Sequence, residues 1–302
     1  MGKKIDMREL KGIYPAIVTS FDDTGAYTSE SMRRIVRHQL EAGVDGFYVC
    51  GGTGEGLLLT RNERQAVLET VLDEVKGDAG VVAHIGAFQT TETLALARHA
   101  SEVGVDAIAA LPPAYFYRPD TLALIRYYTA VAEASSVPLL IYNIPQRTGI
   151  TMTQDLFDRL LELPNIVGMK DSSGDVYSLG LFSAGRTAPV IFEGEDTVLL
   201  AGLLAGACGG IGATYNIMPR LFVQLWNAFQ AKDLDAAAKT QGRINELISA
   251  LEVVDLFGGL KQTLAWMGLE CGEPRTPNRP LTADETVKLR RSLEKASFFE
   301  EL

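Results

Sequence analysis

Short apolar segments alternate with amphipathic segments along the chain as far as Pro219. The apolar segments are rich in β-branched residues and are bounded by polar residues, glycine or proline, which is typical of buried strands. Eight strands are predicted on this basis. They are Ile13–Thr19, Gly46–Cys50, Val81–Ile85, Asp106–Leu111, Val137–Asn143, Ile166–Lys170, Val190–Gly194 and Gly209–Ala213.

Amphipathic helices are expected between these strands, because apolar residues recur there at helical spacing. The predicted helices are Ser29–Ala42, Arg61–Val75, Glu92–Val103, Leu122–Ala134, Thr153–Leu163 and Thr197–Ala205. Repeated βα units favour right-handed crossovers and a closed (β/α)8 TIM barrel. A doubly wound open sheet is the alternative arrangement.

The strand pattern stops after Pro219, and the rest of the chain has the pattern of helices only. These helices are predicted at Leu221–Gln230, Leu234–Leu251, Leu260–Met267 and Ala283–Ser297. No Ser/Gly-rich linker precedes them, so we expect them to pack on the barrel. We therefore expect a catalytic barrel at residues 1–220 and a C-terminal helical extension at residues 221–302.

Composition narrows the possible partners. The 302 residues include 28 Lys plus Arg and 38 Asp plus Glu, a formal net charge of −10. This acidic balance argues against general nucleic-acid binding and against docking on anionic membranes. With no apolar segment of about 20 residues and no signal-peptide pattern, we expect a soluble, cytoplasmic protein. Three Cys and three His without metal-ligand spacing predict no metal site, and the scattered Cys indicate a reducing compartment.

Reactive residues of a βα barrel cluster at the carboxyl ends of its strands. There, Lys170 ends the apolar segment that begins at Ile166. Removal from water favours the neutral amine, which can attack a carbonyl carbon. The alternative is a lysine that reaches solvent or pairs with a carboxylate.

Two further candidate segments fall at strand ends of the predicted barrel. Tyr142 ends the preceding strand, and since adjacent strands lie about 4.8 Å apart, its phenol could carry a proton to or from a molecule bound at Lys170. The loop Gly51–Gly56 fails both phosphate-loop patterns, yet its N–H groups and the Thr53 hydroxyl suit a carboxylate. A packing tyrosine and a simple tight turn are the alternatives. His84 is expected to be a hydrogen-bonded core residue.

Several segments, in order along the chain, resemble the N-acetylneuraminate lyase and dihydrodipicolinate synthase family of Schiff-base-forming, pyruvate-dependent lyases and aldolases. The similar segments are Gly51-Gly52-Thr53-Gly54-Glu55, Tyr142-Asn143-Ile144-Pro145, Gly168-Met169-Lys170-Asp171-Ser172-Ser173-Gly174-Asp175, Gly194-Glu195-Asp196 and Gly209-Gly210-Ile211-Gly212-Ala213-Thr214-Tyr215-Asn216. The resemblance thus covers nearly the whole chain.

This resemblance implies that Lys170 forms an imine with pyruvate or a longer 2-oxo acid and that Tyr142 relays protons. It places the substrate carboxylate on Thr53 and on the N–H groups of the loop. The implied binding residues are Gly51, Gly52, Thr53, Arg147, Ser172, Gly194, Asp196 and Ile211. The resemblance also implies a homotetramer without metal or cofactor, in which an aromatic residue, Tyr115 or Tyr117, crosses a subunit interface.

The segment Leu204–Met218 makes the chain more similar to the N-acetylneuraminate lyase subgroup than to the synthases. Three positions nevertheless depart from the usual residues of that subgroup. Gly52 stands where both subgroups usually carry a hydroxyl residue. Thr197 stands where sialic-acid lyases typically have a Glu that holds the sugar's tail, although Asp196 is retained. Arg147 resembles the arginine with which dihydrodipicolinate synthases bind the carboxylate of the aldehyde partner.

The leading hypothesis is therefore a class I aldolase that cleaves an N-acetylneuraminate-like 2-oxo acid to pyruvate and an aldehyde. One alternative is dihydrodipicolinate synthase, which joins pyruvate to aspartate semialdehyde. A second is a lyase or dehydratase of another deoxy-2-oxo sugar acid. A third, from a different class, is a non-catalytic 2-oxo-acid sensor.

Overall fold

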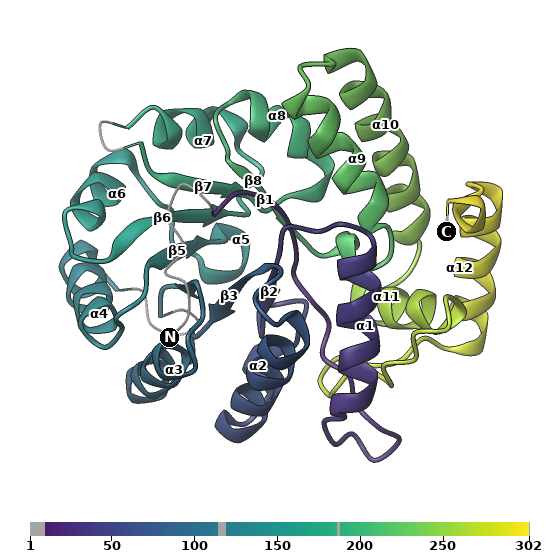
Figure 1. Ribbon diagram of the computed structural model, residues 1–302, viewed down its shortest axis with the longest axis horizontal. Helices are drawn as coiled ribbons and strands as arrows, with labels where there is room; N and C mark the ends of the chain where they lie inside the picture. The colour runs from purple at the N-terminus through teal and green to yellow at the C-terminus, as the bar shows by residue number, and fades with distance from the viewer. Residues whose placement is uncertain (1–9, 114–118, 186–187, 302) are drawn as a thin grey trace.

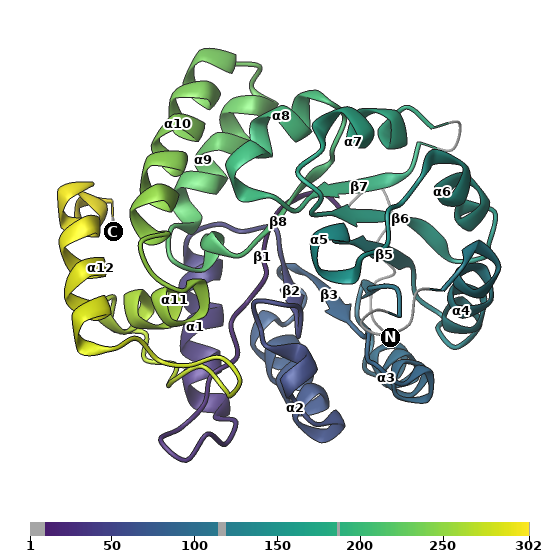
Figure 2. The same ribbon diagram turned by 180° about the vertical axis from the view of Figure 1, so that it is seen from behind.

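Eight parallel strands form a ring in the computed structural model, which describes residues 10–113, 119–185 and 188–301 (Figures 1 and 2). The strands are β1 (Gly12–Pro15), β2 (Gly46–Val49), β3 (Gly80–His84), β4 (Ala107–Ala110), β5 (Leu139–Asn143), β6 (Ile166–Asp171), β7 (Val190–Glu193) and β8 (Gly209–Gly212). Their order is β1-β8-β7-β6-β5-β4-β3-β2. A parallel bridge between Ala16 and Tyr48 joins the first strand to the second. The predicted (β/α)8 barrel is confirmed, and the open-sheet alternative is wrong.

Helices surround the ring (Figure 1), and further helices follow the last strand. The helices between strands are α1 (Ser29–Glu41), α2 (Arg61–Val75), α3 (Thr90–Val103), α4 (Thr121–Glu133), α5 (Pro145–Thr148), α6 (Gln154–Leu161), α7 (Val176–Ser183) and α8 (Leu199–Leu204). The later ones are α9 (Pro219–Gln230), α10 (Leu234–Leu251), α11 (Leu256–Trp266) and α12 (Ala283–Lys295). Short 3₁₀ turns are η2 (Gly56–Leu58), η3 (Asp196–Val198), η4 (Thr214–Asn216) and η5 (Phe298–Glu300).

The interior of the ring is filled at the amino-terminal ends of the strands. The rings of Tyr14 and Phe192 meet edge to face there, with 5.2 Å between their centroids. Glycines make room for them, because a Cβ at Gly46 or Gly80 would collide with or crowd the Tyr14 ring. Since this end is packed, the space inside the barrel that remains for a ligand lies at the carboxyl ends.

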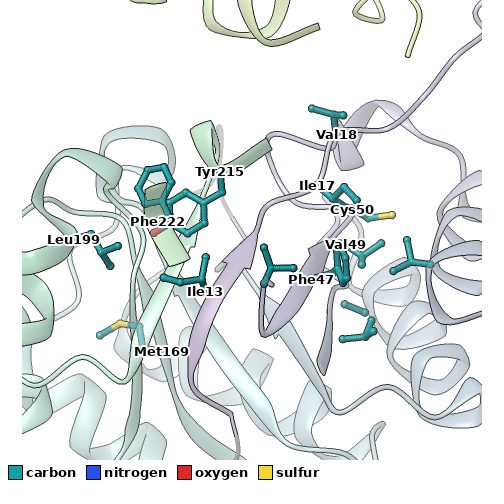
Figure 3. Close-up of a cluster of buried hydrophobic side chains, with 14 of the residues drawn as sticks. Ile13, Ile17, Val18, Phe47, Val49, Cys50, Met169, Leu199, Tyr215 and Phe222 are labelled. Atoms are coloured by element: carbon teal, nitrogen blue, oxygen red, sulfur yellow. The ribbon is translucent and has the colours of Figure 1, made fainter. Parts of the chain in front are cut away.

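A second apolar layer lies between the strands and the helices (Figure 3). Figure 3 shows side chains from β1, β2, β6, α8 and α9 in this layer, among them Ile13, Phe47 and Met169. Tyr215 and Phe222 pack closely, with their ring centroids 3.8 Å apart. Each fully buried apolar side chain of this kind stabilises the fold by about 1.5–3 kcal/mol relative to an exposed one. This layer fixes the strand ends that carry the candidate site.

The C-terminal helices pack on one side of the barrel. The boundary expected at residue 220 falls at the start of α9, which follows β8 and contacts both β1 and α8. Next to it, α10 contacts α8, α9 and α12, and α10 and α12 lie side by side in Figures 1 and 2. Within the described ranges, no helix is both long and apolar enough to cross a membrane.

Candidate active site

Lys170 points into the barrel near the carboxyl end of β6 and is only 4% exposed. Its Nζ lies 4.5 Å from the ring centroid of Tyr142 and 4.5 Å from that of Tyr48. Tyr142 is opposite Lys170 in the β5–β6 register, so the expected proximity of these two side chains is confirmed. Tyr48 was not predicted as a site residue. Its position in β2 could have indicated this placement. Side chains alternate along a strand, so Tyr48 points into the barrel where Phe47 packs outward against the helices.

The residue after β7, Gly194, lies beside Lys170 and has no room for a side chain. A Cβ at Gly194 would lie 3.0 Å from Cε of Lys170 and would collide with Oγ of Ser172. The Ser172 hydroxyl donates to the Gly194 carbonyl oxygen at 3.1 Å, and the Gly194 N–H donates to the Asp171 carbonyl oxygen at 2.6 Å. These hydrogen bonds hold the ends of β6 and β7 together. The absence of a side chain at Gly194 leaves space for the Lys170 side chain.

A cavity of about 380 Å³ lies over Lys170. It brings together most of the predicted residues, namely Thr53, Tyr142, Arg147, Lys170, Ser172, Gly194, Asp196 and Ile211. Ile144, Glu195, Ala213 and Thr214 also line it and belong to the segments that resemble the family, and Thr197 is one of the positions that depart from it. The remaining lining residues were not predicted: Gln146, Ile248, Leu251, Glu252 and Leu256. The last four come from α10, its carboxyl end and α11, so the extension supplies one wall. No local pattern could have indicated this, because it depends on how the helices pack.

Two predicted residues, Gly51 and Gly52, are not among the described residues that line the cavity. Gly51 is buried against the Tyr48 ring, and Gly52 is exposed with open space where a Cβ would lie. A hydroxyl residue would therefore fit at position 52, and this chain lacks it. Tyr115 and the alternative Tyr117 lie outside the described residues.

The glycine-rich loop forms a compact turn after β2. The Glu55 N–H donates to the Gly52 carbonyl oxygen at 3.0 Å, and the Gly56 N–H donates to the Gly51 carbonyl oxygen at 3.0 Å. The Thr19 hydroxyl donates to the Gly54 carbonyl oxygen at 2.6 Å. A tight turn is thus present, and it also brings Thr53 to the cavity.

Asp196 provides a buried carboxylate at the cavity wall. Burial raises its pKa to about 6, against the effect of hydrogen bonds from Thr214, whose N–H and hydroxyl both donate to Oδ2, at 2.8 and 2.6 Å. The Thr197 hydroxyl donates to Glu195 Oε1 at 2.8 Å. Arg147 is exposed at the rim. The outer cavity therefore offers acceptors for hydroxyl groups together with one guanidinium.

His84 lies in the barrel interior, with its ring centroid 5.8 Å from that of Tyr142. Its Nδ1 is 3.1 Å from the Cys50 carbonyl oxygen, and burial lowers its pKa to about 3. The prediction of a hydrogen-bonded core histidine is confirmed. Because the ring is neutral at ordinary pH, it cannot serve as a charged acid.

The chemical capacity of the site follows from these placements. A buried amine next to a phenol, in a cavity with a polar outer wall, suits attack on a carbonyl carbon followed by proton transfer. In the part of the chain that the structure describes, no group of three His, Cys, Asp or Glu residues could hold a metal ion.

Comparisons with known proteins agree with this geometry. The model of the dihydrodipicolinate synthetase family matches residues 9–296. An N-acetylneuraminate lyase from Citrobacter koseri is 36% identical over 274 residues, covering 89% of this chain and 92% of the relative. The solved sialic acid aldolase from Ruminococcus gnavus superposes with a TM-score of 0.92 at 33% identity, covering 97% and 99% of the two chains. A dihydrodipicolinate synthase from Bacillus anthracis gives 0.88 at 28% identity, covering 97% and 99%.

Proposed function

Because this chain belongs to the dihydrodipicolinate synthetase family, we propose that it is a class I aldolase in which Lys170 forms a Schiff base with a 2-oxo acid. One observation carries the proposal: the buried Nζ of Lys170 lies at the base of a cavity, 4.5 Å from the Tyr142 ring. A related aldolase, 32% identical to this chain, has been solved as a catalytic lysine mutant.

In the proposed reaction, the neutral Lys170 amine attacks C2 of the 2-oxo acid and water leaves, which gives an iminium ion. The C3–C4 bond then breaks, and its electron pair moves toward the iminium to form an enamine. The hydroxyl proton at C4 leaves as the aldehyde forms, and Tyr142 relays it. Protonation of the enamine at C3 and hydrolysis release pyruvate and free Lys170.

The substrate carboxylate would bind at the Gly51–Thr53 turn. Thr53 lines the cavity, and backbone N–H groups of such a turn favour anions. Gly52 carries no hydroxyl, so the Thr53 hydroxyl would be the only one that this turn supplies. Gly194 and Ile211 would lie beside the Schiff base, since both line the cavity with Lys170.

Cleavage of an N-acetylneuraminate-like sugar acid is the preferred reaction. The relatives named N-acetylneuraminate lyase support it, as do the hydroxyl-binding groups Asp196, Thr214 and Glu195 at the cavity wall. Condensation of pyruvate with aspartate semialdehyde is the second candidate, favoured by Arg147 at the rim. The presence of Thr197 favours the third, a lyase or dehydratase of another deoxy-2-oxo sugar acid.

We also propose that the chain assembles as a homotetramer, with Tyr115 or Tyr117 at an interface. Exposed apolar side chains support an assembly: Tyr177 and Leu181 are one turn apart on α7, and Leu204 ends α8, which packs beside α7. Large exposed apolar side chains gathered on neighbouring helices indicate a protein contact. Sedimentation velocity tests this, and a monomer at micromolar concentration would contradict it.

The deciding experiment treats the protein with pyruvate and borohydride and locates the adduct by mass spectrometry. We expect one reduced adduct at Lys170, and an unmodified Lys170 peptide would overturn the proposed chemistry. Turnover is then measured with N-acetylneuraminate, with aspartate semialdehyde plus pyruvate, and with deoxy-2-oxo sugar acids. An adduct without turnover of any of them would favour the sensor.

A further inference from the structure

The acidic residue of the glycine-rich turn, Glu55, is bound by residues from the far end of the chain. Its side chain is fully buried, and its Oε1 lies 2.9 Å from Nζ of Lys261 in α11. Its Oε2 accepts hydrogen bonds from the Arg275 N–H at 2.7 Å and from Nδ2 of Asn278 at 3.1 Å. Three groups that are each more than 200 positions away therefore hold one side chain of the turn.

The Lys261 amine is enclosed by the Glu55 carboxylate, a backbone carbonyl oxygen and an aromatic ring. It is 4% exposed, donates to the Glu273 carbonyl oxygen at 3.1 Å, and lies 4.2 Å from the centroid of the Phe21 ring. A buried ion pair with this number of hydrogen bonds is strongly directional, and removing one partner leaves the other charged and uncompensated. The pair therefore strongly resists displacement of Glu55.

The position of Glu55 determines the shape of the turn. Its backbone has φ of 54°, a left-handed conformation that non-glycine residues rarely adopt. Its N–H donates to the Gly52 carbonyl oxygen, so Gly52 and Thr53 lie within the ring that this hydrogen bond closes. A shift of the Glu55 side chain would move the Thr53 hydroxyl and the neighbouring N–H groups.

We propose that Glu55 and Lys261 are positioning residues that hold the Gly51–Thr53 turn in the conformation that binds the carboxylate of the 2-oxo acid. The C-terminal extension thereby sets the affinity for pyruvate at a site in the barrel. This inference rests on the proposed function. Neither side chain lines the cavity that contains Lys170, so their effect passes through the turn.

The test measures the rate of borohydride trapping at Lys170 over a range of pyruvate concentrations. In Glu55→Gln and Lys261→Met, we expect the half-saturating pyruvate concentration to rise about tenfold or more. The trapping rate at saturation should change by less than about threefold, because Lys170 and Tyr142 stay in place. Asn278→Ala removes one donor but keeps the ion pair, and we expect a rise of about three- to fivefold.

Glu63→Gln is the matched control. Glu63 binds Arg275 with both carboxylate oxygens, so it links the same C-terminal segment to α2 without touching the turn. Glutamine can keep the capping box that Glu63 forms with Thr60 at the start of α2. We expect its half-saturating pyruvate concentration to equal that of the wild type.

Two results would overturn the inference. One is an unchanged half-saturating concentration in Asn278→Ala or in a folded Glu55→Gln or Lys261→Met. The other is an equal rise in Glu63→Gln, which would indicate general loosening of the extension. If the two ion-pair variants do not fold, Asn278→Ala still decides, because its side chain is partly exposed and the pair remains. Absence of any adduct in the wild type would instead contradict the proposed function.

Discussion

Two lysines in this protein are buried to the same extent but have opposite surroundings. Lys170 and Lys261 are each 4% exposed. Lys261 lies against the Glu55 carboxylate, whereas in the described residues no carboxylate lies within ion-pair distance of Lys170. Two tyrosine rings surround Lys170 instead. Burial lowers the pKa of Lys261, and the Glu55 carboxylate opposes this.

The difference bears on what each lysine can do. A carboxylate partner fixes the proton on an amine and uses it as a hydrogen-bond donor. An amine without such a partner has no carboxylate that occupies its nitrogen, which leaves the nitrogen accessible to the carbonyl carbon of a bound molecule. If burial were the only criterion, both lysines would be candidates for a reactive amine. The neighbours of the two lysines support the reaction chemistry proposed for Lys170 and the positioning role proposed for Lys261.

Lys170→Ala should have the largest effect. Without the amine no imine can form, so we expect the pyruvate adduct to disappear and turnover to fall by at least about 10⁴-fold. Mass spectrometry after borohydride reduction and steady-state kinetics measure the two effects. Lys261→Met is the comparison, and it should still form the adduct at saturating pyruvate. An adduct in Lys170→Ala would show that the amine is elsewhere.

Tyr142→Phe separates the ring beside Lys170 from its hydroxyl. The ring that lies 4.5 Å from Nζ is kept, so trapping of pyruvate should persist. Turnover should fall by about 10²–10⁴-fold, the usual contribution of a positioned proton carrier. Tyr48→Phe is the matched control, because its phenol is fully buried and does not line the cavity. Turnover of Tyr142→Phe equal to that of the wild type would refute the proton relay.

The order of the two lysines should reverse when stability is measured, with Lys261 having the larger effect. Lys261→Met leaves the buried Glu55 carboxylate without its counter-charge, and we expect the free energy of unfolding to fall by about 3–5 kcal/mol. Lys170→Met removes a buried amine that has no carboxylate partner, so a change within about 1 kcal/mol is expected. Urea unfolding followed by circular dichroism measures both. Equal losses of unfolding free energy in the two variants would mean that the Glu55–Lys261 ion pair stabilises the fold no more than the aromatic contacts of Lys170 do.

The alternation of apolar and amphipathic segments was sufficient to predict the barrel, because each strand and helix is specified by its own residues. The same holds for Lys170 and Tyr142, whose places at the ends of successive strands imply that they meet. The Glu55–Lys261 pair and the wall made by Ile248, Leu251 and Leu256 could not be predicted. The pair joins segments 206 residues apart, and the wall joins the extension to the strand ends of the barrel. Only the packing of α10 and α11 on the barrel brings these parts together.

Glu193 is a buried carboxylate that, like the Lys170 amine, has no ion-pair partner among the described residues. It ends β7 opposite Asp171 of β6, and its Oε1 accepts a hydrogen bond from the Glu195 N–H at 2.8 Å. Burial raises its pKa to about 8, against this hydrogen bond, and the Asp171 and Glu195 carboxylates add to the rise.

The sign of the pH dependence follows from that pKa. A carboxyl group whose pKa is higher in the folded protein than the unfolded value of 4.5 stabilises the fold at low pH, and this contribution is lost as pH rises through about 8. Glu193→Gln cannot ionise, so its stability should be close to that of the wild type near pH 5 and exceed it by roughly 4–5 kcal/mol near pH 9, because the interval between 4.5 and about 8 counts about 1.4 kcal/mol per pH unit. Urea unfolding across this range measures the difference. Parallel pH profiles of the two proteins would contradict the raised pKa of Glu193.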